Sequence, residues 1–184
     1  MHEIMIKTSS MLSEPEQREY AQTIALWTAE AAHRGEPVLA QSAERLWEQF
    51  INHNSLVAFA CGQLSGHITT YLLGEHNATH WYEVGSLIVP PEQRGMGLGN
   101  ALSEAMAYQH PQAHLIATSK YPYAIRALSR AGFQVINYQT VPDVIRAPLC
   151  YDASCYVPTQ PHTCRDEHNC GGYCFALARP PIQP

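Results

Sequence analysis

Apolar positions along this chain follow two periods, one typical of strands and one typical of helices. Strands are predicted where apolar and polar residues alternate or where short apolar runs stand between turn residues, and helices where apolar positions share one helical face. The predicted elements are strand 2–8, helix 13–34, a helix from about 42, strands 55–61, 65–72 and 80–89, a helix from about 97, strand 114–118, helix 122–132, and terminal strands 133–141 and 149–157. This order predicts an α/β fold with a mixed central sheet flanked by about four helices.

Local signals set several of the expected boundaries. Ser13 and Glu16 have the spacing of a capping box, which predicts a helix start. Gly132 follows an apolar helical face, where a left-handed residue commonly ends a helix. The run Gly62-Gln63-Leu64 predicts a hairpin turn between two strands. Cys61 belongs to the apolar strand before this turn and is therefore expected in the core.

The segment from Leu87 to Gly99 reads LIVPPEQRGMGLG, with three glycines at alternate positions between a predicted strand and a predicted helix. Glycines let backbone N–H groups approach a ligand closely. The start of a helix adds unpaired N–H donors and a favourable dipole, and together these features suit a pyrophosphate. Arg94 can add charge-assisted hydrogen bonds.

Two common phosphate-binding loops do not fit this segment. A Walker loop requires Gly-Lys followed by Ser or Thr, whereas Asn100 follows Gly99. The dinucleotide fingerprint requires Gly-x-Gly-x-x-Gly. Its last glycine is replaced by Asn100 when the pattern starts at Gly95, and by Leu102 when it starts at Gly97.

From Val89 through Gly99 the chain resembles, without a gap, the acetyl-CoA-binding motif of the GNAT superfamily of N-acetyltransferases, Val-x-Pro-x-x-Arg-Gly-x-Gly-x-Gly. The segment 124–133, which ends in Gly132-Phe133, is similar to the helix that flanks the cofactor in that family. The resemblance implies a GNAT-like domain over 1–157. It also implies pantetheine binding by Leu87, Ile88 and Val89, and pyrophosphate binding by the N–H groups of Arg94, Gly95, Met96, Gly97, Leu98 and Gly99.

Acyl transfer to an amine needs a group that accepts the amine proton. Glu83 is the predicted base, because several protein acetyltransferases of the GNAT family carry a glutamate six residues before the position of Val89. Strand alternation predicts that Glu83, Gly85, Leu87 and Val89 share one face. The resemblance also implies an oxyanion donor, a backbone N–H near Leu87 or Ile88.

The general acid departs from the family pattern. Many GNAT members carry a tyrosine four residues before the glycine of Gly-Phe, but this chain has Leu128 there. Tyr121 and Tyr123 are the predicted substitutes, with His80 and Tyr82 as fallback bases and Ser129 as another possible acid. Alternatively, no protein acid is needed, because a thiolate is a tolerable leaving group near neutral pH.

Five of the six cysteines fall between Cys150 and Cys174, in a Cys/His-rich stretch whose last part, 158–184, is predicted to be a C-terminal extension packed on or following the domain. Cysteine and histidine at this density favour a zinc site. The strongest ligand set is Cys164, His168, Cys170 and Cys174. Ordinary packing of reduced cysteines and redox chemistry remain alternatives.

The formal charge of -5 argues against nucleic acid as a partner, since proteins that follow a phosphate backbone carry clustered Lys and Arg. We find neither a signal peptide nor a stretch of about 18 apolar residues, so we expect a cytoplasmic protein without a membrane partner.

The predicted function is transfer of an acetyl or short acyl group from acyl-CoA to a primary amine on a small molecule or peptide. A non-catalytic acyl-CoA sensor and a zinc-tailed adaptor are the alternatives. Both monomer and homodimer remain open.

Overall fold

In the described part of the chain, seven strands form a single sheet in the order β1-β2-β3-β4-β5-β7-β6. The computed structural model describes residues 3–36, 38, 40–119, 121–137, 140–149 and 175–181. The strands are β1 (Ile4–Thr8), β2 (Ser55–Ala60), β3 (Gln63–His76), β4 (Thr79–Ile88), β5 (His114–Ser119), β6 (Gln134–Ile136) and β7 (Phe175–Arg179). All neighbouring strands are antiparallel except β4 and β5, which are parallel. The predicted mixed α/β sheet is therefore confirmed.

Five α-helices accompany the sheet in the described part of the chain, one more than predicted. They are α1 (Glu14–His33), α2 (Ala43–Ile51), α3 (Leu98–Gln109), α4 (Pro122–Arg130) and α5 (Asp143–Leu149). Short 3-10 turns, η1 (Ser9–Met11) and η2 (Pro91–Gln93), precede α1 and follow β4. None of the described helices is long and apolar enough to cross a membrane.

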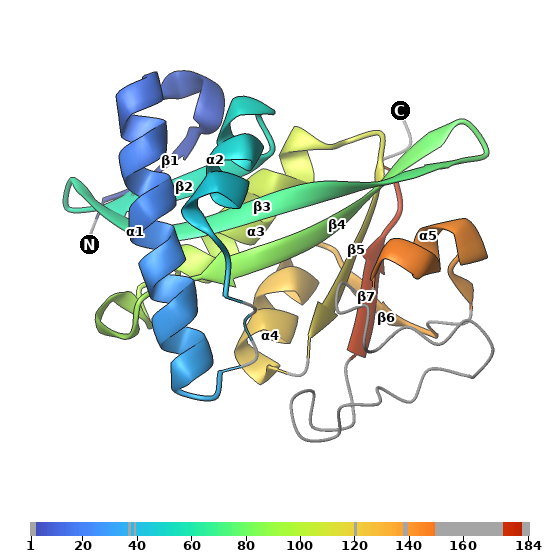
Figure 1. Ribbon diagram of the computed structural model, residues 1–184. Helices are drawn as coiled ribbons and strands as arrows, with labels where there is room; N and C mark the ends of the chain where they lie inside the picture. Colours follow the sequence, from blue (N-terminus) through green and yellow to red (C-terminus); the bar gives the residue numbers. More distant parts are fainter. Residues whose placement is uncertain are drawn as a thin grey trace.

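The helices cover both faces of the sheet (Figure 1). Strand β2 packs against helices on both faces. Its residues Leu56, Ala58 and Ala60 pack with α3 and α4, and Val57 and Phe59 pack with α1 and α2. Strand side chains point alternately to the two faces, so an all-apolar strand serves two cores. A third cluster joins Trp81 and Ile116 to Ile145 of α5.

The predicted helix starts and stops of α1, α2 and α4 are confirmed. The Glu16 carboxylate accepts a hydrogen bond from the Ser13 N–H at 2.7 Å, and the Ser42 hydroxyl accepts one from the Arg45 N–H at 3.2 Å. These bonds satisfy N–H groups that a helix start leaves unpaired. Gly132 ends α4 with a φ of 90°, in the left-handed region.

The prediction that Cys61 lies in the core is wrong. The turn between β2 and β3 is Cys61-Gly62, both residues have positive φ (51° and 77°), and Cys61 is exposed. A two-residue hairpin turn that matches strand twist requires positive φ at both positions. The hairpin therefore turns earlier than the run Gly62-Gln63-Leu64 predicted.

The predicted terminal strands are partly wrong. Strand β6 ends at Ile136, short of the predicted 141. Leu149, the first residue of the predicted strand 149–157, ends α5 instead, and residues 150–157 of that prediction lie outside the described residues. The last described strand is Phe175–Arg179, which lies between β5 and β6. Residues 175–179, which lie within the predicted extension over 158–184, pair with β5 from Leu115 to Ser119.

Candidate functional site

The parallel pairing of β4 with β5 is short, and this opens the sheet. Only Trp81, Tyr82 and Glu83 of β4 pair with β5, opposite His114, Leu115 and Ile116. Beyond these pairs β5 continues along β7 to Ser119, while β4 continues along β3 to Ile88, and the two strands diverge (Figure 1). Because the strands are parallel, their carboxyl ends lie at the same edge. The segment that contains the three glycines, residues 94–99 (the glycine segment), and α4 both begin at this edge. Glu83 stands at the closed end of this opening.

The glycine segment forms the open end. After β4 the chain turns through η2, and Gly95 and Gly97 have φ values of 85° and 87°. Gly97 is the N-cap of α3 and has no side chain to bond the N–H groups of its first turn. Left-handed glycines before a helix start turn successive N–H groups toward one side. This backbone arrangement is suited to a pyrophosphate, and binding by Arg94, Gly95, Met96, Gly97, Leu98 and Gly99 stays a prediction.

Arg94 is engaged with the segment between α1 and α2. Its guanidinium donates to the Val89 carbonyl oxygen at 3.0 Å and to Glu36 Oε2 at 2.7 Å, and Arg34 donates to Glu36 Oε1 at 2.9 Å. Burial acts to raise the pKa of the Glu36 carboxyl, but the two guanidinium groups outweigh it and lower that pKa. Glu36 therefore joins the glycine segment to the end of α1.

Replacing Glu36 by glutamine is expected to lower the free energy of unfolding by about 1 to 2 kcal/mol, because two charge-assisted hydrogen bonds lose their anion. The figure is modest because both guanidinium groups are partly exposed. Urea unfolding measures the change, with Glu104→Gln on the exposed face of α3 as the matched control. Equal stability of the two variants would contradict this assignment.

Glu83 is partly buried within the sheet opening. Burial raises the pKa of its carboxyl to about 7, although the positive charge of Arg45 opposes part of that rise. A carboxylate with such a pKa accepts a proton near neutral pH far better than an exposed glutamate does. The chemistry required of the predicted base is therefore available at this position.

A β-bulge in β4 changes the faces that strand alternation predicted. His67 of β3 pairs with Ile88 and Thr69 pairs with Gly85, so three steps along β4 oppose two along β3, and Ser86 has a φ of 50°. Leu87 and Val89 consequently pack on the α3 side, whereas Ile88 packs on the α1–α2 side. The prediction that Glu83, Gly85, Leu87 and Val89 share one face is wrong, because the extra residue inverts the alternation.

His67 supports the bulge from the α2 side. Its ring is fully buried, with Nδ1 3.2 Å from the Ser86 carbonyl oxygen and Nε2 3.2 Å from the Ser55 hydroxyl. A carbonyl oxygen only accepts, so Nδ1 carries the proton and donates it to Ser86. Burial lowers the pKa of His67 to about 4, against a backbone hydrogen bond that acts to raise it.

This buried histidine predicts loss of stability in mild acid. Between pH 6.5 and about 4 the unfolded chain binds a proton at residue 67 that the folded protein does not bind. Stability attributable to His67 therefore falls as pH falls through this window, with a slope of up to about 1.4 kcal/mol per pH unit. Denaturant unfolding at several pH values should give a shallower acid slope for His67→Gln than for the parent, and a parent-like slope for exposed His33→Gln. Parallel curves for the parent and His67→Gln would contradict the prediction.

Further polar side chains gather around Glu83 on the face covered by α2. Tyr71 is the cross-strand neighbour of Glu83, and its hydroxyl lies 3.4 Å from Gln41 Oε1 and 3.3 Å from Ser86 Oγ. The Arg45 guanidinium carbon lies 5.3 Å from the centroid of the Tyr71 ring. We call Gln41, Arg45, Tyr71, Glu83 and Ser86 the Glu83 cluster. Sequence analysis found only Glu83 of this set, because strand register and helix docking bring the others there.

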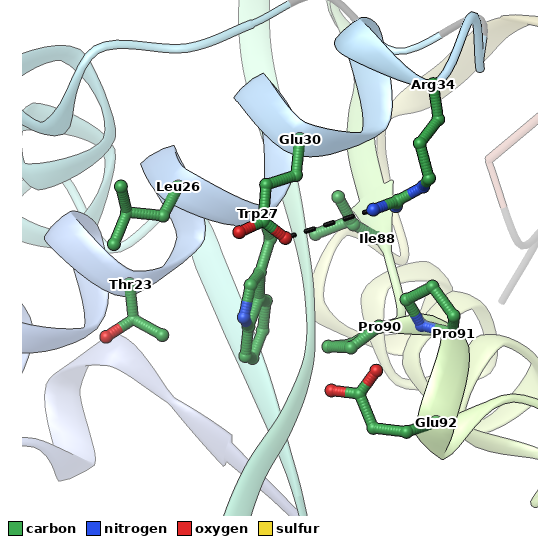
Figure 2. A pocket seen from close by; sticks show the side chains of 9 residues that line it. All are labelled: Thr23, Leu26, Trp27, Glu30, Arg34, Ile88, Pro90, Pro91 and Glu92. Carbon is green, nitrogen blue, oxygen red and sulfur yellow. Dashed lines mark ion pairs between the residues drawn. The ribbon is translucent and has the colours of Figure 1, made fainter.

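A separate hollow of about 280 Å³ adjoins the start of the glycine segment (Figure 2). One wall is a face of α1 and the other is the end of β4 with η2. The lining residues are Thr23, Leu26, Trp27, Glu30, Arg34, Ile88, Pro90, Pro91 and Glu92. Glu30 and Arg34 form an ion pair at 3.9 Å across one side. Neither Glu83 nor a glycine of the segment lines this hollow, so it is distinct from the sheet opening.

The sequence profile of the acetyltransferase (GNAT) family matches residues 15–133, which is more than half of the chain. The chain belongs to the GNAT acetyltransferase family. The predictions of this family, of its α/β fold and of an acyltransferase are confirmed. The matched range includes the glycine segment, Glu83 and α4.

Solved structures share the GNAT fold at low sequence identity. N-acetylglutamate synthase from Neisseria gonorrhoeae, complexed with coenzyme A and N-acetyl-glutamate, is 17% identical over 96% of this chain with a TM-score of 0.63. The chain covers only 35% of that synthase. Rv2747 from Mycobacterium tuberculosis, in complex with CoA, is 14% identical, with 95% of this chain and 97% of that chain covered and a TM-score of 0.68. A GNAT acetyltransferase from Streptococcus agalactiae is 12% identical, with 98% of this chain and 96% of that chain covered and a TM-score of 0.61. No curated protein sequence matches the chain.

The predicted acid positions lie where α4 begins, at the open end of the sheet opening. Tyr121 is the N-cap of α4 directly after β5 and is partly buried, whereas the side chain of Tyr123 is 74% exposed. Their ring centroids are 6.3 Å apart. Leu128, at the position of the family tyrosine, is buried in the core beneath the sheet. At this position Leu128 therefore packs in the core and has no proton to donate.

The predicted zinc ligands Cys164, His168, Cys170 and Cys174 lie outside the described residues, so zinc binding stays a prediction. Within the part of the chain that the structure describes, no group of three or more His, Cys, Asp or Glu side chains is arranged to hold a metal ion.

Proposed function

We propose that this GNAT protein transfers an acetyl or short acyl group from acyl-CoA to a primary amine by direct attack in a ternary complex. The observation that carries the proposal is the opening of the sheet where β4 and β5 stop pairing. This opening has a glycine-lined helix start at one end and Glu83, with its raised pKa, at the other. The pantetheine arm of acyl-CoA, extending from the helix start toward Glu83, would bring its thioester next to this base.

The glycine segment and β4 would hold the cosubstrate. The N–H groups from Gly95 to Gly99 bind the pyrophosphate, and the backbone from Leu87 to Val89 lies along the pantetheine. The Arg94 N–H, predicted with them, instead donates to the Pro91 carbonyl oxygen at 3.2 Å. When bound, acyl-CoA supplies the thioester carbonyl that the amine attacks. The fit rests on the two left-handed glycines and on the uncapped start of α3.

Glu83 accepts the proton that the attacking amine loses. Its carboxylate is the basic form, so the reaction requires pH near or above its pKa of about 7. The bulge at Ser86 leaves backbone groups out of the β3 ladder, and an N–H at Leu87 or Ile88 donates to the developing oxyanion. Tyr121 is the nearer of the two tyrosines to β5 and protonates the departing thiolate, with Tyr123 as the exposed alternative.

The CoA-bound relatives support the choice of cosubstrate, and the complex of one relative with N-acetyl-glutamate supports an amine acceptor. Initial-rate kinetics with acetyl-CoA and a reactive amine test the mechanism. Direct attack in a ternary complex predicts intersecting double-reciprocal lines. Parallel lines, as expected when a covalent acyl-enzyme forms, would contradict it.

A further inference from the structure

Arg45 brings a positive charge to the acceptor side of the proposed base. It lies in the first turn of α2, is partly buried, and stands over the ring of Tyr71 at 5.3 Å. Tyr71 is directly opposite Glu83 in the β3–β4 ladder. A ligand whose amine faces Glu83 therefore has the Arg45 guanidinium within the reach of a small molecule.

The surroundings hold this arrangement in place before any ligand arrives. The Gln41 N–H donates to the Thr28 hydroxyl of α1 at 3.0 Å, and the Ser42 hydroxyl accepts from the Arg45 N–H at 3.2 Å. Gln41 Oε1 in turn lies 3.4 Å from the Tyr71 hydroxyl. The turn that carries Arg45 is thus tied to α1 on one side and to β3 on the other, which reduces the ordering needed on binding.

The charges of the Glu83 cluster favour amines that also carry a carboxylate over simple alkylamines. A simple alkylamine brings one positive charge and no anion, so it gains nothing from the Arg45 guanidinium. An amine that also carries a carboxylate brings an anion for Arg45, whose planar guanidinium matches a carboxylate with two parallel hydrogen bonds.

We propose that the acceptor is a primary amine that also carries a carboxylate, as an amino acid does, with the carboxylate on Arg45 and the amine facing Glu83. The inference rests on the proposed transfer reaction and names its substrate class. Arg45 is then the residue that determines acceptor specificity. The proposal applies to free amino acids and to peptides whose terminal or side-chain carboxylate lies near the reacting amine.

The test compares matched acceptors. The twenty common L-amino acids are each assayed with acetyl-CoA beside their α-amides and their decarboxylated amines, and kcat/KM is measured for the parent, Arg45→Met and Arg45→Lys. We expect the best acid to exceed its amide by at least about tenfold in the parent. Arg45→Met should reduce this ratio about tenfold or more, mainly through KM, and Arg45→Lys should restore part of it.

Several outcomes would overturn the inference. The first is an equal kcat/KM of the parent for amides and acids. The second is an acid-to-amide ratio of kcat/KM that is unchanged in Arg45→Met. The third is an equal loss of kcat/KM for acids and amides in that variant, which would indicate a structural role of Arg45. Circular dichroism and acetyl-CoA calorimetry establish that each variant is folded, and Arg45→Lys replaces Arg45→Met where the latter is not. Failure of the proposed function looks different, because no amine of any class then supports CoA release, and the inference falls with it.

Discussion

Replacement of Glu83 by glutamine is expected to lower kcat by about 10² to 10⁴-fold, the contribution typical of a positioned general base. Glutamine keeps the size of the side chain and removes its ability to take a proton. Acetyl-CoA affinity should stay within about threefold of the parent, because the groups proposed to bind the cosubstrate are left in place. Glu75→Gln, on the exposed part of neighbouring β3, is the matched control and should keep parent activity.

The pH profile ties this loss to the titration of one group. Because the carboxylate is the active form and burial raises the pKa of Glu83 to about 7, kcat/KM of the parent should fall as pH falls through that value. The inflection should vanish in Glu83→Gln. A parent-like kcat in that variant, or an unchanged inflection near pH 7, would remove Glu83 from the reaction.

The second large effect is expected in the glycine segment, where Gly97→Asp combined with Gly99→Asp should weaken acetyl-CoA binding by at least about 100-fold. Two negative charges would lie at the N-terminus of α3, where the pyrophosphate is proposed to bind. A side chain at residue 97 must also adopt a φ near 87°, at a cost of about 1–2 kcal/mol for residues other than glycine.

The matched control separates charge from shape. Gly97→Asn with Gly99→Asn adds side chains of nearly the same size without charge, and Asn tolerates the left-handed region. At residue 99 a Cβ meets the Ala127 Cβ at 3.9 Å, an ordinary contact, so the fold has room for the first side-chain atom. Calorimetry should rank the parent above the Asn variant and the Asn variant above the Asp variant. Equal binding by the folded Asp variant and the parent would place the pyrophosphate elsewhere.

The sequence predicted those parts of the fold and site that depend on local signals. The glycine segment, its flanking strand and helix, the capping box at Ser13 and the stop at Gly132 all follow from residues close together in the chain. Glu83 was chosen as the candidate base through its spacing from Val89, and its role stays a prediction. A resemblance in order and spacing therefore located both ends of the sheet opening.

The missed features depend on contacts between distant segments. An extra residue at Ser86 reverses the faces of β4. Gly85 is a local sign of such a bulge, since an isolated glycine in a strand often marks one, but it does not by itself reveal that the alternation is inverted. Strand β7 was missed because it follows β6 after a long connection and pairs with β5. Arg45 and Glu36 acquire their chemistry only when α2 docks on β3 and when Arg94 reaches the end of α1.

The measurement that tests the central claim most directly is product analysis by mass spectrometry. The parent is incubated with acetyl-CoA labelled in its acetyl group and with a pool of primary amines that includes the L-amino acids, and both CoA and labelled amide are quantified. The account predicts labelled N-acetyl product in amounts equal to the CoA released, with little of either from Glu83→Gln. Intact acetyl-CoA, or CoA released without any acetylated amine, would contradict it.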